Sequence, residues 1–598
     1  MTNREKVASA LVLLWAALSV YLLFYFFSIP RNLLAFALAA GASALLGKKA
    51  LACREKRVWL PCGLFAAFFS AALVVGRRVD EENAEFLGLS RADGVYWAVF
   101  TLYFCLLSAA VILWLREHPL PLGKAPLPEG RLGRALSWAS WSGFIALCFL
   151  FYYFVFFPGL LTGDSFACLI RAMGLAKFNN QQPIVYQLLL SVFVRLGWLL
   201  GEDPASGQAG VALFSLFQLL CMAAMFGCCL YWLRRHGCPR PVLWGLAVFF
   251  GANPLHAMYA VTLWKDVMFG GFLMLLVLFL WDTAAEKGEN LLRWQGILAF
   301  VLLSFAVSFF RNNGVYIFAC VVVVMAVQLR ARWKRVLPLL LAVSGAIYLI
   351  QGPLYTALNI GVGTPAESLA IPLQQIARVV DREGEITEEQ REFLEPLLPL
   401  ETVKEQYWAF TVDRIKFHED FDDYYLATHL GEFFRTWAGM LGPNLKEYCV
   451  AYLMETAGYW RLGTTNWIVA PGIQGYSDTY GVEPANLTQR YLGADLQQPI
   501  QDWVARLQEG DFTGPLFNIA SMVWLLFFLF PLLLAQKRGR ELLCLLPLLL
   551  LWGTTMVAAP TYCELRYVYG LFTAAPAALW IALPKRGAQG PEEGKGEV

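Results

Sequence analysis

Residues 136–157 read LSWASWSGFIALCFLFYYFVFF, and residues 158–165 continue PGLLTGDS. The first stretch carries no charge and is long enough for a membrane-spanning helix, which needs about 20 apolar residues. The second stretch leaves that helix through a Pro-Gly turn and reaches a carboxylate, Asp164. Together they predict a helix that delivers an acidic residue to the surface of a membrane.

The composition of the whole chain agrees with a membrane protein. Of 598 residues, 58% are hydrophobic and 15% are charged, which excludes a disordered chain and an ordinary soluble enzyme. Lys and Arg number 47 against 45 Asp and Glu, so the net charge of +2 indicates no nucleic-acid partner. The 13 cysteines show no CxxC pair and no metal spacing, so we expect neither a zinc site nor a disulfide framework.

Fifteen apolar segments are long enough to consider as membrane spans. If all of them crossed, the basic turn that follows residue 233 would lie outside, against the tendency of Lys and Arg to stay inside. One segment therefore does not cross, and we expect an all-α polytopic membrane protein with about 14 transmembrane helices. The segments lie near 9–28, 32–46, 58–76, 94–115, 136–157, 184–200, 209–233, 242–262, 267–282, 294–310, 315–329, 336–352, 515–535, 541–559 and 567–584.

The segment at 184–200 is the best candidate for a helix that lies in the membrane interface. Gln187, Ser191 and Arg195 recur every fourth residue and line one helical face, with Leu and Val on the other. Without this segment both termini are cytoplasmic. The cytoplasmic segments then hold 26 Lys and Arg against 10 in the short outer loops, as the charge rule requires.

A long region between the eleventh and twelfth spans contains no spanning segment. Its 24 Asp and Glu against 11 Lys and Arg predict an acidic extracytoplasmic soluble insertion, α or mixed α/β. The expected domains are four N-terminal transmembrane helices in 1–135, a membrane core in 136–352 with an outer loop at 158–208 that includes the juxtamembrane helix at 184–200, the acidic domain in 353–514, three C-terminal transmembrane helices in 515–584 and a cytoplasmic tail in 585–598.

Polar residues next to the spans gather on the outer side of this topology. Taken singly, each has an ordinary explanation: a carboxylate can cap a helix, and an arginine can reach lipid headgroups. Taken together, separate outer turns supply acidic, basic and amide groups to one membrane face, which predicts a site there. The turns contain Asp164, Lys265-Asp266, Arg311-Asn312-Asn313-Gly314 and Glu564-Leu565-Arg566-Tyr567.

The residue types indicate a chemistry. Lys265, Arg311 and Arg566 suit a phosphate or pyrophosphate anchored by a lipid, because Arg gives bidentate contacts and Lys a point charge. Asp164 could accept a proton from an incoming hydroxyl. The combination fits transfer of a group from a lipid phosphate, in which cations stabilise the leaving group and a carboxylate activates the nucleophile.

The sequences PGLLTGDS, NNQQP, LWKDV, RNNG and ELRY, in this order, resemble those of a bacterial multi-pass family within the GT-C superfamily of integral-membrane glycosyltransferases. The resemblance covers roughly 136–352 and 541–584. It implies a GT-C-like core, a location in the bacterial plasma membrane, and an inverting enzyme that moves a sugar from a polyprenyl-phosphate donor to an envelope glycan, lipid or protein acceptor on the outer face.

The resemblance also implies roles for single residues. Asp164 and Asp266 would be the catalytic carboxylates, and Lys265, Arg311 and Arg566 would bind the donor phosphate. Many relatives carry His or Lys before the proline of the juxtamembrane helix, where this chain has Gln182. The two carboxylates could share a divalent cation, Mg²⁺ or Mn²⁺, but no DxD pair is present, so no cofactor is fixed. The further substrate-binding candidates are Asn180, Gln181, Gln182, Asn312, Asn313, Glu564 and Tyr567.

Two other functions stay open from the residues alone. In a lipid or solute transporter, or flippase, the same ions would line a translocation path, although the chain shows no internal repeat of the kind such proteins carry. In an envelope scaffold, the acidic domain would bind a partner, and neutral substitutions of all three cations would be tolerated.

Overall fold

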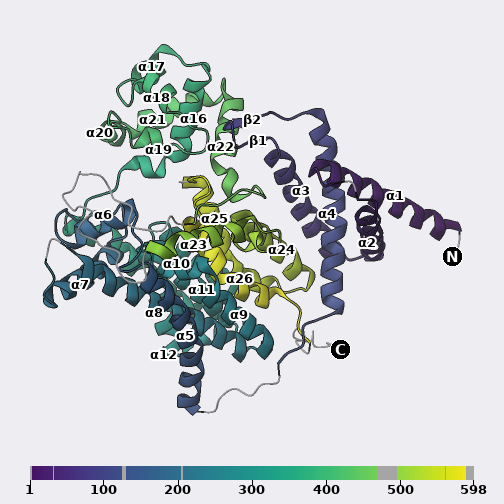
Figure 1. Ribbon diagram of the computed structural model, residues 1–598, viewed down its shortest axis with the longest axis horizontal. Helices are drawn as coiled ribbons and strands as arrows, with labels where there is room; N and C mark the ends of the chain where they lie inside the picture. The colour runs from purple at the N-terminus through teal and green to yellow at the C-terminus, as the bar shows by residue number, and fades with distance from the viewer. Residues whose placement is uncertain are drawn as a thin grey trace.

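The computed structural model describes residues 3–30, 32–123, 130–203, 206–468, 494–558 and 560–586 (Figure 1). The described part is almost entirely helical, as predicted. Its one paired sheet is a short antiparallel hairpin of β1 (Val79–Asp80) and β2 (Glu85–Phe86). The expected cytoplasmic tail, 585–598, lies outside the described residues beyond Arg586.

Each of the fifteen apolar segments contains a helix. Among the described residues, nine helices are long and apolar enough to cross a membrane, as a multi-pass membrane protein requires. The helices of these segments are α1 (Asn3–Phe26), α2 (Leu33–Leu51), α3 (Lys56–Gly76), α4 (Arg91–Glu117), α5 (Gly130–Val155), α7 (Ile184–Leu199), α8 (Gln208–Arg235), α9 (Arg240–Ala252), α10 (Pro254–Ala260), α11 (Lys265–Ala285), α12 (Trp294–Phe310), α13 (Gly314–Gln328), α14 (Trp333–Leu349), α24 (Ile519–Ala535), α25 (Leu542–Ala558) and α26 (Tyr569–Ala582).

The apolar segment at 242–262 is broken into α9 and α10. Proline lacks a backbone N–H and clashes with the preceding turn, so a helix does not run through it easily. Asn253 has an extended backbone at the break, and its side chain accepts a hydrogen bond of 3.0 Å from the backbone N–H of Leu255. The Asn-Pro pair therefore ends one helix and starts the next.

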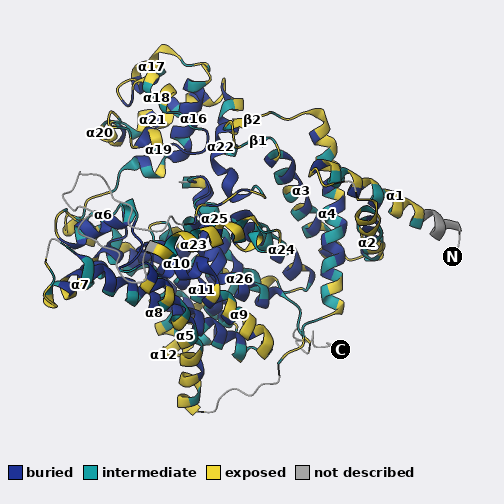
Figure 2. Ribbon diagram, viewed as in Figure 1, coloured by how far each residue is buried: buried dark blue, intermediate teal, exposed yellow. Residues whose placement is uncertain are grey.

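Apolar side chains cover much of the outside of the helical body. In Figure 2 exposed residues follow one side of α1 and α2, where Leu14 is 67% and Leu45 74% exposed. Leu302 of α12 and Tyr348 of α14 are exposed in the same way. Large exposed apolar surfaces are unusual for a protein in water, and they suit helices that face lipid.

The turns between helices meet in two separate groups. We call the first group the Asp164 face: it joins the turns at 77–90, 158–183, 261–266, 311–314 and 560–568. We call the second group the Lys585 face: it joins the turns at 117–123, 235–240, 282–294, 536–541 and 583–586. For example, Leu160 pairs with Thr262 on one face, and Leu120 pairs with Lys585 on the other.

The helix α7 packs against the start of α8. Two of its side chains, Tyr186 and Phe193, contact the same ring, Phe214, with centroids 5.4 and 5.6 Å apart. Phe214 is the seventh residue of α8, so these contacts place α7 against the start of that helix. Its buried face carries Gln187 and Ser191, and its exposed face carries leucines and valines. The predicted shared face is confirmed for Gln187 and Ser191 but is wrong for Arg195, which is exposed, and Leu190 and Val194 lie on the buried face as well.

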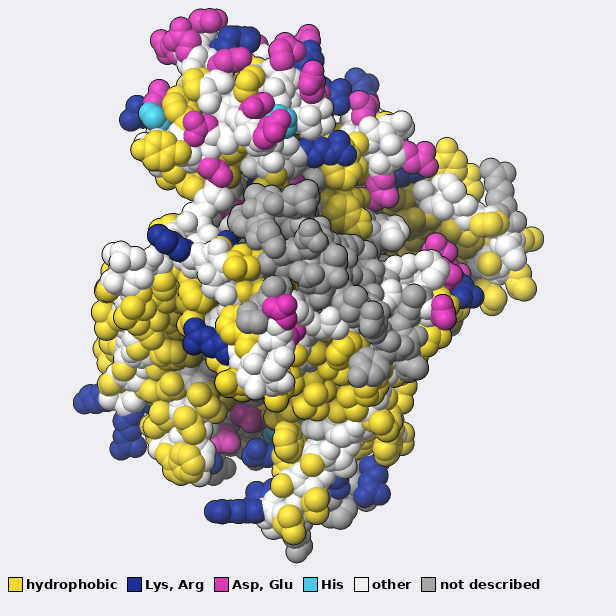
Figure 3. Space-filling model, turned by 60° about the vertical axis from the view of Figure 1, so that its left-hand side comes forward, with side chains coloured by type: hydrophobic (Ala, Val, Ile, Leu, Met, Phe, Trp, Pro, Cys, Tyr) yellow, Lys and Arg dark blue, Asp and Glu magenta, His cyan; other side chains and the backbone are white. Residues whose placement is uncertain are grey.

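Residues 365–459 form a helical unit with its own hydrophobic cluster, which includes Leu373, Val379, Leu426, Phe433 and Met440. The acidic side chains gather on this unit in Figure 3, above a body whose surface is largely hydrophobic. Of the two predicted alternatives, the described part of the region is helical rather than mixed α/β. The helices are α16 (Ala370–Asp381), α17 (Glu388–Leu394), α18 (Leu400–Gln406), α19 (Asp413–Lys416), α20 (Asp423–Thr428), α21 (Leu430–Leu441) and α22 (Leu445–Thr456), with α23 (Ala494–Glu509) further along the chain.

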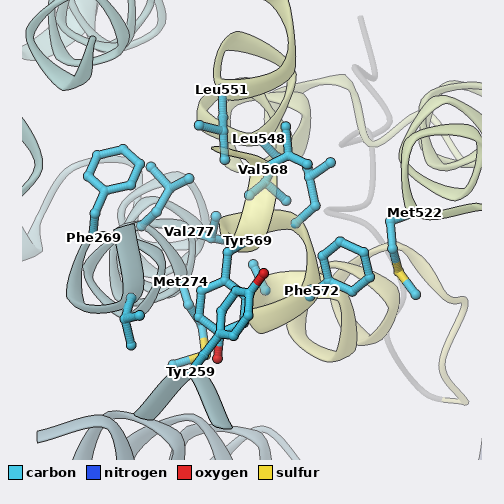
Figure 4. Packing of buried hydrophobic residues seen from close by; sticks show 14 of the residues in the cluster. Tyr259, Phe269, Met274, Val277, Met522, Leu548, Leu551, Val568, Tyr569 and Phe572 are labelled. Carbon is cyan, nitrogen blue, oxygen red and sulfur yellow. The ribbon is translucent and has the colours of Figure 1, made fainter. Parts of the chain in front are cut away.

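An aromatic layer lies directly beneath the Asp164 face. Tyr259 of α10 and Tyr569 of α26 face each other with ring centroids 4.7 Å apart, and both are fully buried (Figure 4). His256 donates or accepts a hydrogen bond of 2.9 Å with the Tyr569 hydroxyl. His256 is a fully buried core residue with one ring nitrogen bonded in this way, so it links α10 to α26 beneath the turns.

Candidate functional site

Asp164 is held in place by the backbone of the loop before it. The N–H of Leu160 donates to the carbonyl of Val261 at 2.9 Å, and the N–H of Leu263 donates to the carbonyl of Leu160 at 3.0 Å. The indole of Trp264 donates to the Thr162 hydroxyl at 2.8 Å. These bonds fix the loop against the turn that carries Lys265.

Asp164 itself lies in the first turn of α6 (Gly163–Ala172), where the helix dipole favours a negative charge. Arg566 donates to one carboxylate oxygen at 2.6 Å, and the Gln182 amide donates to the other at 3.1 Å. The Lys265 ammonium is 4.0 Å from the first oxygen, and it also donates to the Gln182 carbonyl oxygen. The Asp164 side chain is still 36% exposed, so a substrate can reach it.

A second ion pair lies one residue along from Lys265. Asp266 is 1% exposed and its carboxylate is 3.0 Å from the guanidinium of Arg311. Arg311 also donates to the backbone carbonyl of Tyr567 and lies over the Tyr567 ring, 5.1 Å from its centroid. This pair ties the end of α12 to the turn that carries Arg566.

Arg566 lies between two carboxylates. Its Nη1 contacts Asp164, and its Nε is 3.3 Å from Glu564. The guanidinium also lies over the rings of Trp264 and Tyr567, at 4.9 and 5.2 Å from their centroids. A planar, weakly hydrated cation suits this position better than lysine would.

The two carboxylates beside Arg566 titrate differently. Burial alone would raise the pKa of Asp164, but Arg566 and Lys265 outweigh it and hold the pKa of this carboxyl well below its usual range. Burial raises the pKa of Glu564 to about 7, although Arg566 opposes it, and the charges of Asp266 and Asp164 add to the rise. At neutral pH Asp164 is therefore an anion, whereas Glu564 is shared between its neutral and charged forms.

The amide residues named from the sequence lie around these charges. The Asn312 side chain donates to the backbone carbonyl of Asn180 at 2.8 Å, which holds the loop before α7. The Gln181 amide donates to Glu367 of the helical unit at 3.3 Å. Asn313 donates to Thr554 in α25 at 2.9 Å, so its amide secures the helices instead of facing Asp164.

Lys416 is part of this neighbourhood, and the sequence did not point to it. Its ammonium is 2.9 Å from Asp413 and 3.0 Å from Glu367, and its side chain is 5% exposed. Burial alone would lower the pKa of Lys416, but Asp413 and Glu367 raise it above its usual value. Its charge also helps to lower the pKa of Asp164. In the sequence, Lys416 is followed by Phe and His in an acidic segment. This pattern does not distinguish it from an ordinary surface lysine.

The carboxylates do not form an obvious metal site. Among the described residues, no three His, Cys, Asp or Glu side chains gather as cation ligands. Asp164 and Asp266 each have a guanidinium as their nearest charged partner. This donor set suits pairing with organic cations more than with a divalent ion, so we assign no step to a metal.

A protein-family model matches residues 173–594, and its description is that of a family of unknown function, DUF6020. The match includes Gln182, Lys265, Arg311 and Arg566 and begins nine residues after Asp164. No curated protein and no solved structure matches the chain.

Proposed function

The chain belongs to the DUF6020 family of unknown function, and from the site itself we propose that it is a membrane glycosyltransferase of the GT-C type. It moves a sugar from a polyprenyl-phosphate donor to an acceptor of the cell envelope. The observation that carries the proposal is the contact of Asp164 with Arg566 and Lys265, groups brought together from three distant turns.

Two of the three cations, Lys265 and Arg566, form the proposed donor-phosphate site, and the third supports it. Lys265 has no carboxylate closer than 4.0 Å, so it is the cation most available to an incoming phosphate. Arg566 is 14% exposed and offers a second, bidentate contact. Arg311 is paired with Asp266 and holds the turn of Arg566, so we assign it a positioning role in donor binding.

Donor binding also activates Asp164. A carboxylate whose pKa is far below its usual range is a weak base. The donor phosphate competes with Asp164 for Arg566 and Lys265, and each contact it takes removes a charge that lowers the Asp164 pKa. Asp164 therefore becomes a stronger base only when the donor is present, which limits wasteful reaction with water.

The transfer is a single displacement. The acceptor oxygen forms a bond to the anomeric carbon while the bond from that carbon to the phosphate oxygen breaks. The electron pair of that bond goes to the phosphate, where Arg566 and Lys265 stabilise the charge. The proton of the acceptor hydroxyl goes to Asp164, and the sugar carbon inverts.

The proposed topology has 14 crossings, with α7 in the interface and both termini in the cytoplasm of a bacterial cell. It is supported by the two faces, because alternate turns along the chain belong to opposite faces once α7 is left out of the count. The Asp164 face is then extracytoplasmic, and so is the acidic helical unit. Lipid-linked donor reaches Asp164 along the apolar face of α7.

The direct test uses purified protein in liposomes with a panel of polyprenyl-phosphate sugars. We expect the parent protein to release polyprenyl phosphate from at least one donor, and Asp164→Asn to slow this release by about 10²- to 10⁴-fold. Asp495→Asn, the same change on the surface of α23, is the matched control and should leave the rate unchanged. Equal rates for Asp164→Asn and the parent would refute the assignment.

One observation favours a transporter as the second candidate. Interrupted helices are common at transporter substrate sites, and α9 and α10 are interrupted at Asn253. The same liposomes distinguish the two functions. A transporter would move labelled lipid or solute between the two sides without breaking the sugar-phosphate bond.

A further inference from the structure

A polar cavity of about 300 Å³ lies beside the turn that carries Glu564 and Arg566. Its volume is at the lower end of the range for small-molecule sites. Among the described residues that line it, Asp511 is the one charged residue. Half of the others carry an amide or a hydroxyl group, and the rest are glycines and the apolar Leu462, Pro515 and Phe517. The polar lining residues used below are Thr464, Thr465, Asn466, Gln508, Asn518 and Ser521.

Asn466 gives the cavity an unused hydrogen-bond donor. The residue is 3% exposed, and its side-chain oxygen accepts a bond of 2.7 Å from the backbone N–H of Ile519. Its side-chain nitrogen is buried and has no hydrogen-bond partner among the residues that the structure describes. A buried donor left unpaired costs about 1–3 kcal/mol, so this amide is set to receive an acceptor atom from a ligand.

The neighbouring amides are already fixed. Gln508 donates to the backbone carbonyl of Asn466 at 2.9 Å, and Asn518 donates to the backbone carbonyl of Thr464 at 2.8 Å. The wall of the cavity is thereby rigid before a ligand arrives, which reduces the entropy lost on binding.

The wall continues into the candidate site. The backbone N–H of Trp467 donates to the carbonyl of Cys563 at 2.9 Å, and the N–H of Leu565 donates to the carbonyl of Trp467 at 3.3 Å. The segment that lines the cavity with Asn466 therefore pairs, one residue later, with the turn of Glu564. A ligand in the cavity lies next to that turn.

We infer that this cavity binds a neutral sugar unit of the acceptor, so that the acceptor of the proposed glycosyltransferase is a glycan. The inference rests on the proposed function. Among the described residues that line the cavity, none is a cation that could hold a phosphate or a carboxylate, and the apolar groups of Leu462, Pro515 and Phe517 alternate with polar ones, as the two kinds of surface on a sugar ring do. Amides and hydroxyls in a rigid wall match the donors and acceptors of sugar hydroxyls.

The test measures binding and transfer separately on the full-length protein. Titration calorimetry with maltotetraose, chitotetraose and mannotriose should detect binding of at least one of them to the parent. Asn466→Asp keeps the oxygen that bonds Ile519 and removes the unpaired donor, so we expect affinity to fall about tenfold. Thr465→Val, at an exposed lining residue, should weaken binding severalfold without disturbing the fold.

Asn359→Asp is the matched control, because Asn359 is exposed and does not line the cavity. It should bind like the parent. In all three variants donor hydrolysis by water should continue at the parent rate. The inference is overturned if no oligosaccharide binds to the parent, if both cavity variants bind as well as the control, or if serine-rich peptides bind in place of sugars. If sugars bind but no donor is cleaved, the cavity is confirmed as a sugar site and the proposed glycosyl transfer is refuted.

Discussion

The two faces of the helix bundle hold their charged side chains in different ways. On the Lys585 face, Glu541 pairs with Arg538, three residues before it, and also accepts a hydrogen bond from the Trp281 indole. Asp282 accepts one from the Trp232 indole at 3.2 Å. On the Asp164 face, the Arg566 guanidinium serves both Glu564, in its own turn, and Asp164, which is 402 residues away in the chain.

Both faces contain a buried carboxylate oxygen without a hydrogen bond from the described residues, one of Glu286 on the Lys585 face and both of Asp266 on the Asp164 face. Neither carboxylate oxygen of Asp266 accepts a hydrogen bond, although the residue is 1% exposed and lies 3.0 Å from Arg311. Buried ion pairs contribute little net stability, and charged groups at membrane depth are usually kept for a function. The comparison teaches that the Lys585 face fastens helices, whereas the Asp164 face keeps charge available for a ligand.

The largest effect that tests this comparison is expected from a substitution of Arg566. Arg566→Lys keeps the charge and loses the planar fork between Asp164 and Glu564, so we expect release of polyprenyl phosphate to fall by about 10²- to 10³-fold. Arg538→Lys is the matched change on the Lys585 face and should leave the rate within about twofold. Similar losses in both variants would mean that the faces do not differ.

Lys416 tests whether the helical unit belongs to the Asp164 face. Lys416→Met removes a charge that acts on Asp164 and frees Glu367 and Asp413. We expect about a tenfold loss of transfer, roughly 1.4 kcal/mol, with the donor KM rising more than kcat falls. Lys446→Met, at an 87% exposed lysine of the same unit, is the control. An unchanged KM in Lys416→Met would separate the unit from the donor site.

The pH dependence of stability tests the titration of Glu564 on the Asp164 face. Burial raises the pKa of Glu564 to about 7, so the folded state prefers the neutral form, and stability falls as pH rises from the ordinary value of this carboxyl through 7. Glu564→Gln mimics the neutral form and should melt roughly 2–5 °C above the parent at pH 8.5 and with the parent at pH 5. A gap of the same size at both pH values would contradict the assigned titration.

The smallest effect is expected on the Lys585 face. Glu541→Gln weakens the contacts with Arg538 and Trp281. We expect the free energy of unfolding to fall by about 1 kcal/mol, which lowers the melting temperature slightly. Transfer per folded molecule should not change. A loss of transfer without a loss of folded protein would show that this face takes part in the reaction.

The sequence predicted the helices well and the pairings poorly. Hydropathy marks each apolar segment, because every residue of a lipid-facing helix contributes to it. The spacing of Gln187, Ser191 and Arg195 predicted one shared face of α7, and the structure buries the first two but exposes Arg195. The break at Asn253 did not follow from the apolar segment at 242–262, because propensity does not say whether an Asn-Pro pair bends a helix or ends it.

For the site, charge topology indicated which turns share a face but not which side chains touch. That Arg566 pairs with Asp164 while Arg311 pairs with Asp266 depends on how α11, α12 and α26 pack. The effect of Lys416 on Asp164 could not be predicted for the same reason, because Lys416 belongs to the helical unit and comes near the site only where that unit packs. Long-range packing therefore decides what local patterns leave open.

The short hairpin between α3 and α4 connects the first four helices to the rest of the molecule. Glu81, in its turn, accepts from the Tyr562 hydroxyl at 2.6 Å and from Arg461. Tyr562 lies two residues before Glu564, and residues before 173 lie outside the family match. A chimera that exchanged α1–α4 for other helices would therefore need to supply a carboxylate at this position, or the turn of Glu564 would lose this contact and keep only those made by residues beyond α4.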